Sequence, residues 1–387
     1  MEEGHTRYVL LINSLAPGGA ERSLVELLAP LVANGISPVL ICLGRSGIGF
    51  EQEVTEGGFD LRFVTSSRLP GRVREVRSIL RAEKPRLLHT TLFDSDIVGR
   101  LAAWGTHVPV LTTLANTTYE PARIAGDSNL SPGKVSLVRA VDAITARRLT
   151  DQFHAVSEAV KASAVKHLGV DPGLVTVVRR GRDPVRLGRR SEERRSVARE
   201  ELGFGPDACL VLTVGRHEYQ KGQAHLIDAF ARISGRQPSA VLLIAGREGN
   251  ASESLHRKAE ACGVADRVRF LGHRPDVGDL MTAADVFVFP SLWEGLGGVL
   301  IEALALEVPT ISSDLAATRE VVGTDGSSGI LVAPGDVEAL ASAIEGLLNN
   351  PEQRQQAVAH SRKRFETEFL LADRSQDLIE LMSAVAR

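Results

Sequence analysis

The sequence predicts an α/β protein with two doubly wound parallel-sheet domains in series. Short runs rich in β-branched residues alternate with helical stretches from Tyr8 to Val178, and the alternation starts again at Leu210. A strand that is followed by a helix and then by another strand is typical of a parallel sheet. The chain has 387 residues, and single cores stop growing near roughly 250 to 300 residues. Two domains with separate cores are therefore expected.

The predicted elements follow the same rhythm in both halves. The strands expected in the first half are Tyr8–Ile12, Pro38–Leu43, Arg86–His89, Val110–Thr113, Gln152–Val156 and Val175–Val178. Helical periodicity covers Glu21–Asn34 and Gly71–Glu83 between them. The strands expected in the second half are Leu210–Val214, Ala240–Ala245, Val268–Phe270, Val286–Phe289, Thr310–Ser312 and Ile330–Val332. Two polar helices, Pro351–Glu366 and Ala372–Ala386, close the chain.

The stretch from Arg179 to Arg190 is rich in arginine and glycine and has little periodicity, which is typical of an interdomain linker. We place the boundary at Asp183. The expected division is an acceptor-binding domain over residues 1–183, a donor-binding domain over residues 184–365 and a C-terminal helix over residues 366–387. Packing of that helix back on the N-terminal domain is one option.

Composition excludes several classes of protein. The chain holds 45 Lys and Arg against 48 Asp and Glu, a formal net charge of −3, which does not favour a general binder of polyanions. Three cysteines, Cys42, Cys209 and Cys262, lie far apart without metal-site spacing, as expected in a reducing compartment. The start Met1–His5 is acidic, and no apolar run approaches the roughly 18 residues of a membrane span. We expect a cytoplasmic protein.

The segment from Phe289 to Ala305 is the most informative part of the sequence. It contains a strand end, a glycine-rich turn and a helix start. Glycines at a helix N-terminus let backbone N–H groups approach an anion, and the helix dipole favours phosphate there. Glu294 falls in the loop and Glu302 about two turns into the helix, so both carboxylates can face one elongated ligand such as a sugar nucleotide. Surface acids stabilised by the helix dipole would give the same pattern.

Arg216 and Lys221 flank a loop that follows the predicted strand ending at Val214. Ligands of doubly wound sheets bind beyond the carboxyl ends of the strands, so the cleft between two such domains is the expected site. An arginine can chelate phosphate oxygens while a lysine supplies a compact charge, a combination that suits a diphosphate. The alternative is a pair of solvated loop charges.

These features together resemble a known family. The segments that carry the resemblance are Pro17–Glu21, Gly215-Arg216 with Lys221-Gly222, Phe270–Arg274, Glu294-Gly295 through Glu302-Ala303, and Gly329–Asp336. They resemble the retaining nucleotide-sugar glycosyltransferases of glycosyltransferase family 4, and the match extends over nearly the whole chain. The resemblance implies the GT-B fold, in which two Rossmann-like domains face each other across a cleft.

The resemblance also implies residue roles. Arg216 and Lys221 match the pair that holds the donor diphosphate and stabilises the departing nucleotide without a metal ion. Glu302 matches the acid that binds the ribose hydroxyls, and Glu294 matches the acid that contacts the transferred sugar. The other donor-binding positions implied are Gly18, Gly19, Gly272, His273, Arg274, Gly295, Leu296, Gly297, Gly298 and Val299.

His89 ends a predicted strand, so its side chain could face the cleft, although a lone histidine there is more often structural. Many family members have His-x-His at this place, whereas this chain has His89-Thr90-Thr91. Ala115 stands where many relatives have a histidine before the asparagine that is Asn116 here. His89 is our candidate for contact with the transferred sugar or the acceptor, and with Arg216, Lys221 and Glu294 it completes the expected catalytic set.

Two further segments have competing interpretations. Asp94-Ser95-Asp96 has the form of a metal-binding Asp-x-Asp motif, but it precedes a helical stretch, and acidic residues commonly cap the N-terminus of a helix. We expect no metal and no other cofactor. The basic stretch from Arg62 to Arg86 is best interpreted as a solvated helix face; docking to an anionic membrane or a phosphorylated acceptor is the alternative. Nucleic acid is not an expected partner, because few aromatic residues are interleaved there.

The expected function is that of a retaining glycosyltransferase. It would move a hexosyl group from a nucleoside diphosphate sugar, UDP-sugar first, to a hydroxyl or amine of a cell-envelope, lipid or specialised-metabolite acceptor. A GT-B epimerase or phosphorylase and a non-catalytic sugar-nucleotide-binding protein are the alternatives. Peripheral contact with the inner face of the membrane is left open.

Overall fold

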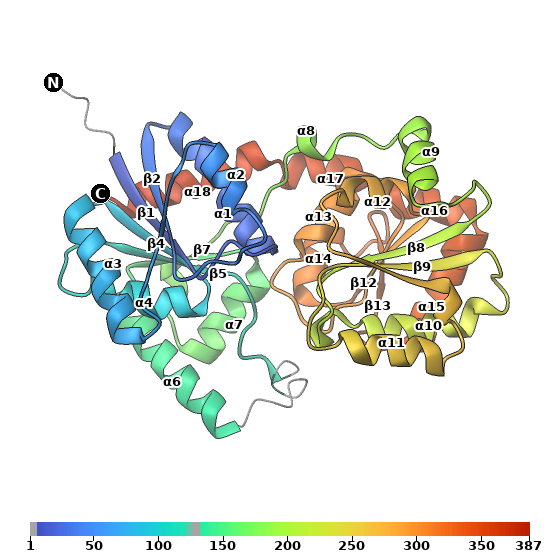
Figure 1. The fold of residues 1–387 in the computed structure, drawn as a ribbon, viewed down its shortest axis with the longest axis horizontal. Coiled ribbons are helices and arrows are strands. Elements are labelled where there is room, and N and C mark those ends of the chain that lie inside the picture. Colours follow the sequence, from blue (N-terminus) through green and yellow to red (C-terminus); the bar gives the residue numbers. More distant parts are fainter. Residues whose placement is uncertain (1–5, 122–123, 125–131) are drawn as a thin grey trace. The chain divides into compact units, whose positions relative to one another are not determined.

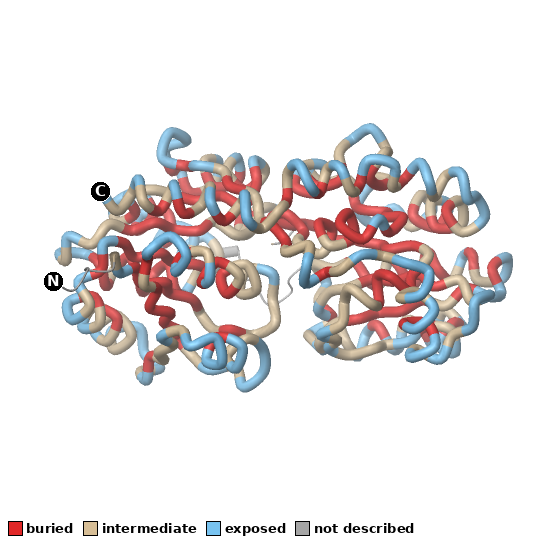
Figure 2. Tube along the Cα trace, turned by 90° about the horizontal axis from the view of Figure 1, so that it is seen from above, coloured by how far each residue is buried: buried red, intermediate tan, exposed pale blue. Residues whose placement is uncertain are grey.

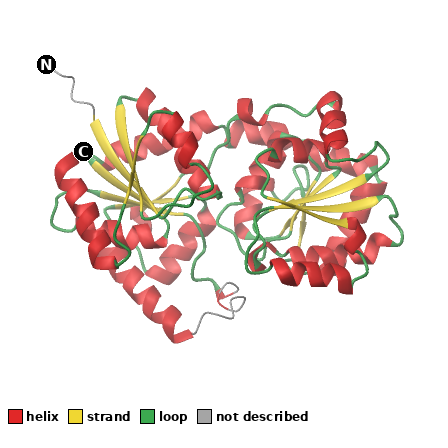
Figure 3. Ribbon diagram, in the orientation of Figure 1, coloured by secondary structure: helices red, strands yellow, loops and turns green. Residues whose placement is uncertain are grey.

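The chain forms two α/β units, each built around a parallel sheet (Figures 1 and 3). The structure is a computed structural model and describes residues 6–121, 124 and 132–387; the acidic start Met1–His5 lies outside them. Unit 1 comprises Met1–Glu120, Leu130–Gly181 and Leu371–Arg387. Unit 2 comprises Pro121–Asn129 and Arg182–Leu370. The predicted boundary at Asp183 falls next to the point where the chain passes from one unit to the other.

Within its described residues, unit 1 holds a seven-stranded sheet in the order β3-β2-β1-β4-β5-β6-β7. The strands are β1 Thr6–Ile12, β2 Ile36–Cys42, β3 Asp60–Phe63, β4 Leu87–Thr91, β5 Val110–Leu114, β6 Gln152–Ala155 and β7 Val175–Val177. The helices are α1 Gly19–Ala33, α2 Glu51–Glu56, α3 Leu69–Glu83, α4 Phe93–Ala103, α6 Pro132–Leu149, α7 Glu158–Leu168 and α18 Leu371–Val385. The strand order reverses between β1 and β4, which is where such a sheet binds ligands.

Alternation along the strands separates two cores in unit 1. Tyr8, Leu10 and Ile12 pack with apolar residues of α1 and of the C-terminal helix α18. Val9 and Leu11 point to the other face and pack with α3 and α4. Successive side chains of a strand point to opposite faces, so this register also fixes the faces of the polar residues further along the sheet. Figure 2 shows that the buried parts of the chain, in red, lie inside each unit, with more exposed parts around them.

Unit 2, described throughout from Arg182 to Leu370, holds a six-stranded sheet in the order β10-β9-β8-β11-β12-β13. The strands are β8 Cys209–Val214, β9 Ala240–Ala245, β10 Val268–Gly272, β11 Val286–Phe289, β12 Thr310–Ser313 and β13 Ile330–Val332. The helices are α8 Pro184–Leu187, α9 Glu192–Glu201, α10 Gln223–Ser234, α11 Ser252–Ala261, α12 Val277–Ala283, α13 Gly298–Ala305, α14 Ala316–Val322, α15 Val337–Asn349, α16 Pro351–Val358 and α17 Ser361–Glu368. Here the strand order reverses between β8 and β11.

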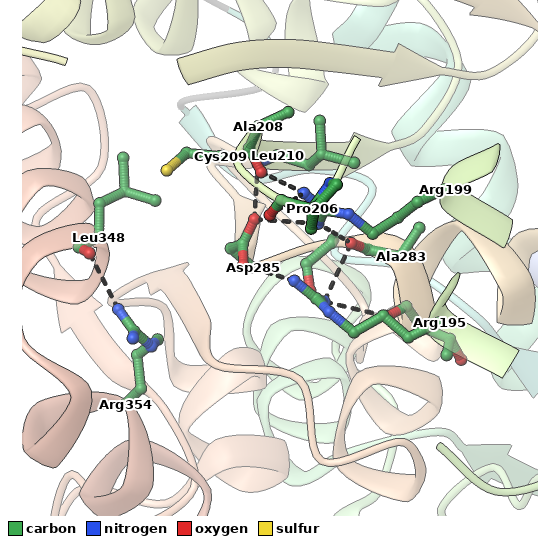
Figure 4. Close-up of polar contacts among 12 residues, drawn as sticks. Arg195, Arg199, Pro206, Ala208, Cys209, Leu210, Ala283, Asp285, Leu348 and Arg354 are labelled. Carbon is green, nitrogen blue, oxygen red and sulfur yellow. Dashed lines mark hydrogen bonds and ion pairs between the residues drawn. The ribbon is translucent and has the colours of Figure 1, made fainter. Parts of the chain in front are cut away.

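A carboxylate anchors the two strands at this reversal. Asp285, directly before β11, accepts a hydrogen bond from the backbone amide of Leu210 at 2.7 Å and from Arg195 Nη2 at 2.6 Å (Figure 4). Arg199 Nη1, from the same helix α9, donates to the carbonyl of Ala283 at 2.9 Å. These bonds fix the starts of β8 and β11 side by side, so the loops at their far ends emerge together.

The predicted fold class is confirmed, because both halves are doubly wound parallel sheets. The prediction missed the short edge strand β3 and the helix α2. It also joined α16 and α17 into one helix. The amide of His360 donates to the carbonyl of Ser327 at 3.0 Å instead of continuing the helix, a tertiary contact with no local signal. No helix in the described part of the chain has both the length and the hydropathy required to cross a bilayer.

Candidate functional site

Two loops meet at the strand reversal of unit 2. The loop after β8 and the loop after β11 are joined by hydrogen bonds from the Leu292 amide to the Gln220 carbonyl and from Gln220 Nε2 to the Trp293 carbonyl, each 2.8 Å long. Gly222 has a φ of +62°, and a Cβ there would lie 1.9 Å from the Pro290 carbonyl oxygen. Only glycine permits this approach, so the two loops form one rigid platform.

Lys221 and Glu294 face each other across this platform. Lys221 Nζ lies 2.5 Å from Glu294 Oε1, and their side chains are 19% and 9% exposed. The aromatic ring of Phe289 lies 5.6 Å from Lys221 Nζ, and the stem of Lys221 crosses over Gly215, where a Cβ would lie 3.3 Å away. Removing Glu294 would leave the largely buried ammonium of Lys221 without this ion pair, which is costly. An incoming anionic ligand can take over the role of the carboxylate.

Arg216 lies on the same platform but is more open to solvent. Its side chain is 45% exposed, and its nearest carboxylate is that of Glu218, at 3.8 Å. Solvent screens such a pair, so Glu218 holds Arg216 only weakly. Arg216 is available to turn toward a ligand.

The predicted ribose acid, Glu302, has a buried partner of its own. Arg182 Nε donates to Glu302 Oε1 at 2.8 Å, and the two side chains are 2% and 14% exposed. A Cβ on Gly298 would lie 2.2 Å from Arg182 Nη2, so any side chain there would force the guanidinium to shift from its place against the start of α13. Sequence reasoning missed Arg182 because it treated the surrounding stretch as linker. The clustering of arginines there was the only signal.

The remaining predicted donor positions lie in two loops of unit 2. Gly295, Leu296 and Gly297 are buried, and Gly297 has a φ of +88° immediately before Gly298 and Val299 begin α13. Their backbone amides stand at the N-terminus of that helix, where an anion is favoured.

The second loop follows β10. Gly272 has a φ of +64°, and its carbonyl accepts a hydrogen bond from the Gly246 amide at 2.8 Å. His273 is exposed. Arg274 is engaged with Asp276, to which its Nε donates at 2.7 Å. This pair lowers the pKa of Asp276 and keeps Arg274 within the loop.

The glycine pair of the N-terminal half lies in unit 1. Gly18 is the N-cap of α1 and has an extended backbone with a φ of −166°. A Cβ on Gly18 would lie 2.2 Å from the carboxylate of Glu21, and one on Gly19 would lie 3.3 Å from Arg180 Nη1. The pair therefore leaves room for side chains that approach the first turn of α1.

His89 lines a cavity of about 50 Å³ in unit 1. The polar residues that line it are Ser23, His89, Thr91, Thr113, His154, Arg179, Arg180, Arg374 and Ser375. His89 is 2% exposed, and burial, with a smaller effect of His154, lowers its pKa to about 3. Burial likewise lowers the pKa of His154 to about 4. Both imidazoles are therefore neutral near pH 7.

The Asp-x-Asp segment has a structural explanation. Asn13 Oδ1 accepts hydrogen bonds from the Ser95 amide at 2.9 Å and the Ser95 hydroxyl at 2.6 Å. Asp94 Oδ2 accepts from Asn13 Nδ2 at 3.3 Å. Asp96 is buried, and desolvation raises its pKa to about 7. Over the described residues there is no group of three or more His, Cys, Asp or Glu side chains placed to hold a metal ion; metal independence stays a prediction.

Comparison with known proteins identifies the family. Residues 17–186 match the family model described as Glycosyltransferase Family 4, and residues 195–364 match the model described as Glycosyl transferases group 1. The chain is 31% identical over 380 residues to D-inositol 3-phosphate glycosyltransferase 2 of Catenulispora acidiphila, which covers 89% of this chain and 86% of that protein. The chain belongs to glycosyltransferase family 4. The predicted resemblance and the enzyme class are confirmed.

This family 4 glycosyltransferase is similar to other members as well. It is 28% identical to the lipopolysaccharide core biosynthesis glycosyltransferase LpsE of Rhizobium meliloti over 356 residues, 91% of this chain and 92% of that protein. Its fold is similar to that of Anabaena HepE crystallised with UDP-glucose, with a TM-score of 0.85, 22% identity and coverage of 98% and 100%. This likeness establishes the GT-B fold.

Proposed function

We propose that this enzyme transfers a hexosyl group, with retention, from a nucleoside diphosphate sugar to a hydroxyl or amine. The observation that carries the proposal is the Lys221–Glu294 pair, which stands at the strand reversal of unit 2 beside the N-terminus of α13. Fixed donors and charges that meet developing charge are the main source of catalysis in such reactions. UDP is the first candidate nucleotide, because HepE was crystallised with UDP-glucose.

The residues of unit 2 have distinct roles in this proposal. Lys221 and Arg216 bind the diphosphate and stabilise its charge as the bond to the sugar breaks, so no metal ion is required. Glu294, released from Lys221 by the phosphates, accepts hydrogen bonds from the sugar hydroxyls. Glu302 holds the ribose, and Arg182 keeps its carboxylate in place. The backbone from Gly272 to Arg274 contacts the base, and the amides from Leu296 to Val299 contact sugar and phosphate.

The acceptor is proposed only as a class. The named relatives act on an inositol phosphate and in lipopolysaccharide core synthesis, so phosphorylated polyol, lipid and cell-envelope glycan acceptors come first and specialised metabolites second. An epimerase with the same fold would return its nucleotide as a nucleotide sugar, and a phosphorylase would cleave a glycoside with phosphate. A binding protein would turn nothing over, so none of the three would release free nucleotide in response to an acceptor.

Four cations of the predicted basic stretch are compatible with contact to an anionic membrane. Arg62, Arg72, Arg77 and Arg86 are engaged within the protein. Arg68, Arg74, Arg81 and Lys84 are exposed. We propose peripheral docking through these four as an accessory property of the transferase, and the cytoplasmic location stays a prediction.

Calorimetric titration tests the donor site. UDP, GDP, ADP and TDP are each titrated into the wild type and Glu302→Ala, with Glu338→Ala, whose carboxylate forms an exposed pair with Arg232, as the control. One nucleotide should bind the wild type and the control equally and bind Glu302→Ala at least about tenfold more weakly. Absence of binding by all four nucleotides would contradict a transferase role. Acceptor-dependent nucleotide release then separates a transferase from its alternatives.

A further inference from the structure

Three polar side chains stand side by side on one face of the unit 1 sheet. Leu87 and Leu111 face α1 and α18, so the pleat directs His89 and Thr113, two positions further on each strand, to the same face. Thr113 of β5 pairs in register with His154 of β6. The cavity lies at the carboxyl ends of these strands.

Hydrogen bonds join the three side chains to one backbone carbonyl. His89 Nε2 lies 2.6 Å from Thr113 Oγ1, Thr113 Oγ1 lies 3.0 Å from His154 Nδ1, and His154 Nε2 lies 2.8 Å from the Val178 carbonyl oxygen. Thr113 and His154 are 6% and 5% exposed. This chain of bonds runs inside the protein, away from competing water.

The carbonyl of Val178 determines the direction of every bond in the chain. A carbonyl only accepts, so His154 Nε2 carries a proton and, in the neutral ring, Nδ1 does not. Thr113 must then donate its single hydroxyl proton to His154 Nδ1. Its oxygen in turn accepts a proton from His89 Nε2. In the neutral His89 ring, Nδ1 is left as an acceptor, and this atom is buried with no hydrogen-bond partner among the described residues.

We propose that Thr113 and His154 are positioning residues that hold His89 as its Nε2–H tautomer, so that Nδ1 accepts a hydrogen bond from a substrate hydroxyl. The choice of ligand rests on the proposed transferase function. The tautomer rests on the hydrogen bonds alone. It makes His89 selective: a hydroxyl or amine can pair with Nδ1, whereas an ether, a fluorine or a carbonyl cannot. Arg179, Arg180 and Arg374 also line the cavity, and the charge of Arg180 opposes protonation of His154.

The tautomer is measured in the free protein by nitrogen NMR with ¹⁵N-labelled histidine, which distinguishes protonated from unprotonated ring nitrogens. His89→Gln and His154→Gln assign the two rings by loss of their signals. We expect Nε2 to be protonated and Nδ1 unprotonated in both rings at pH 7. A protonated Nδ1 on His89, or rapid exchange between its two tautomers, would overturn the proposal. This result needs no substitution in the hydrogen-bonded chain of His89, Thr113 and His154.

Three threonine variants test the hydrogen-bonded chain itself. Thr113→Val keeps the shape of the side chain but removes its hydroxyl, so His89 should become a mixture of tautomers. Thr113→Ser keeps a hydroxyl, so His89 should have a single tautomer there. Thr112→Val is the matched control, because Thr112 is the neighbouring residue and its hydroxyl bonds to Thr90 on the opposite face, 3.0 Å away. An unchanged His89 spectrum in Thr113→Val would contradict the positioning role.

Turnover separates failure of this inference from failure of the proposed function. The donor is a sugar conjugate of the nucleotide that calorimetry identifies. With that donor, Thr113→Val should lower kcat about tenfold or more and leave the nucleotide Kd unchanged, whereas Thr113→Ser should keep kcat near the wild-type value. A wild type with the expected tautomer but no transfer would sink the proposed function alone. Normal kcat in Thr113→Val would sink this inference alone.

Discussion

Arg182 and Glu302 form an almost fully buried ion pair within unit 2. Arg182 Nε donates to Glu302 Oε1 at 2.8 Å, and Gly298 leaves the space that the guanidinium occupies. Glu302 lies on α13, whereas Arg182 is the first residue of the unit after the chain leaves unit 1. The position of the proposed ribose acid is therefore fixed by a residue from the crossing between the units.

This pair predicts that Arg182→Gln weakens nucleotide binding. The carboxylate would lose its charged partner, and an unpaired buried charge costs about 1 to 3 kcal/mol, so Kd should rise about tenfold or more. Calorimetry measures the effect, and Arg232→Gln, which breaks the exposed pair with Glu338, serves as the control. Equal affinity in Arg182→Gln and the wild type would show that the pair serves stability alone.

Lys221→Ala should abolish most turnover. Loss of one preorganised charge that meets a developing anion typically lowers kcat by about 10² to 10³. The control is Lys258→Ala, because Lys258 also forms an ion pair in unit 2, with Asp228 at 2.8 Å, but lies away from the platform. Steady-state kinetics and thermal melts are compared for both. A folded Lys221→Ala enzyme with near-normal kcat would refute the role assigned to Lys221.

Asp96 should make the protein less stable as pH rises from about 4 to about 7. Its folded pKa is raised to about 7, above about 3.9 for an unfolded aspartate. In that window the native state binds more protons than the unfolded state, so each pH unit removes up to about 1.4 kcal/mol. Asp96→Asn should remove this contribution. The free energy of unfolding in urea should therefore exceed that of the wild type by an amount that grows from pH 4 to pH 7. A gain that does not vary with pH would contradict the raised pKa.

His89 and His154 should make the protein less stable as pH falls below about 6.5, the opposite of the effect of Asp96. Their folded pKa values of about 3 and about 4 lie below about 6.5 for an unfolded histidine. The unfolded state takes up protons first, so the stability they contribute is complete above about pH 6.5 and is lost as pH falls toward 4. Two histidines outweigh one aspartate, so wild-type stability should fall between pH 6.5 and 4. His154→Gln should reduce that slope, and an unchanged slope would count against the buried neutral ring.

Exposed cations of α3 predict salt-sensitive binding to anionic vesicles. Each cation near such a surface contributes about 1 kcal/mol. The double variant Arg74→Glu with Arg81→Glu should therefore lose most co-sedimentation with phosphatidylglycerol vesicles, while Arg257→Glu, an exposed change in unit 2, should not. Equal sedimentation of both variants would favour a solvated helix face.

Sequence periodicity predicted most strands, because buried parallel strands are apolar along their whole length. It missed β3, a short polar strand at the sheet edge. Lys221 and Glu294 could be placed near one another from the sequence because loops at the carboxyl ends of adjacent strands meet, and their roles came from the family resemblance. Arg182 was not, because its partner is far along the chain and only the fold brings them together. The relay from His89 to His154 was invisible for the same reason: its members come from three separate strands.

The C-terminal helix α18 has a consequence for synthesis of the protein. Ile379 and Met382 belong to the core shared with α1, and Leu371, Arg374, Ser375 and Leu378 form one wall of the His89 cavity. A ribosome therefore delivers every residue of unit 2 while unit 1, although begun first, still lacks part of its core. The domain that is translated first can therefore complete its core only after residues 371 to 387 have been made.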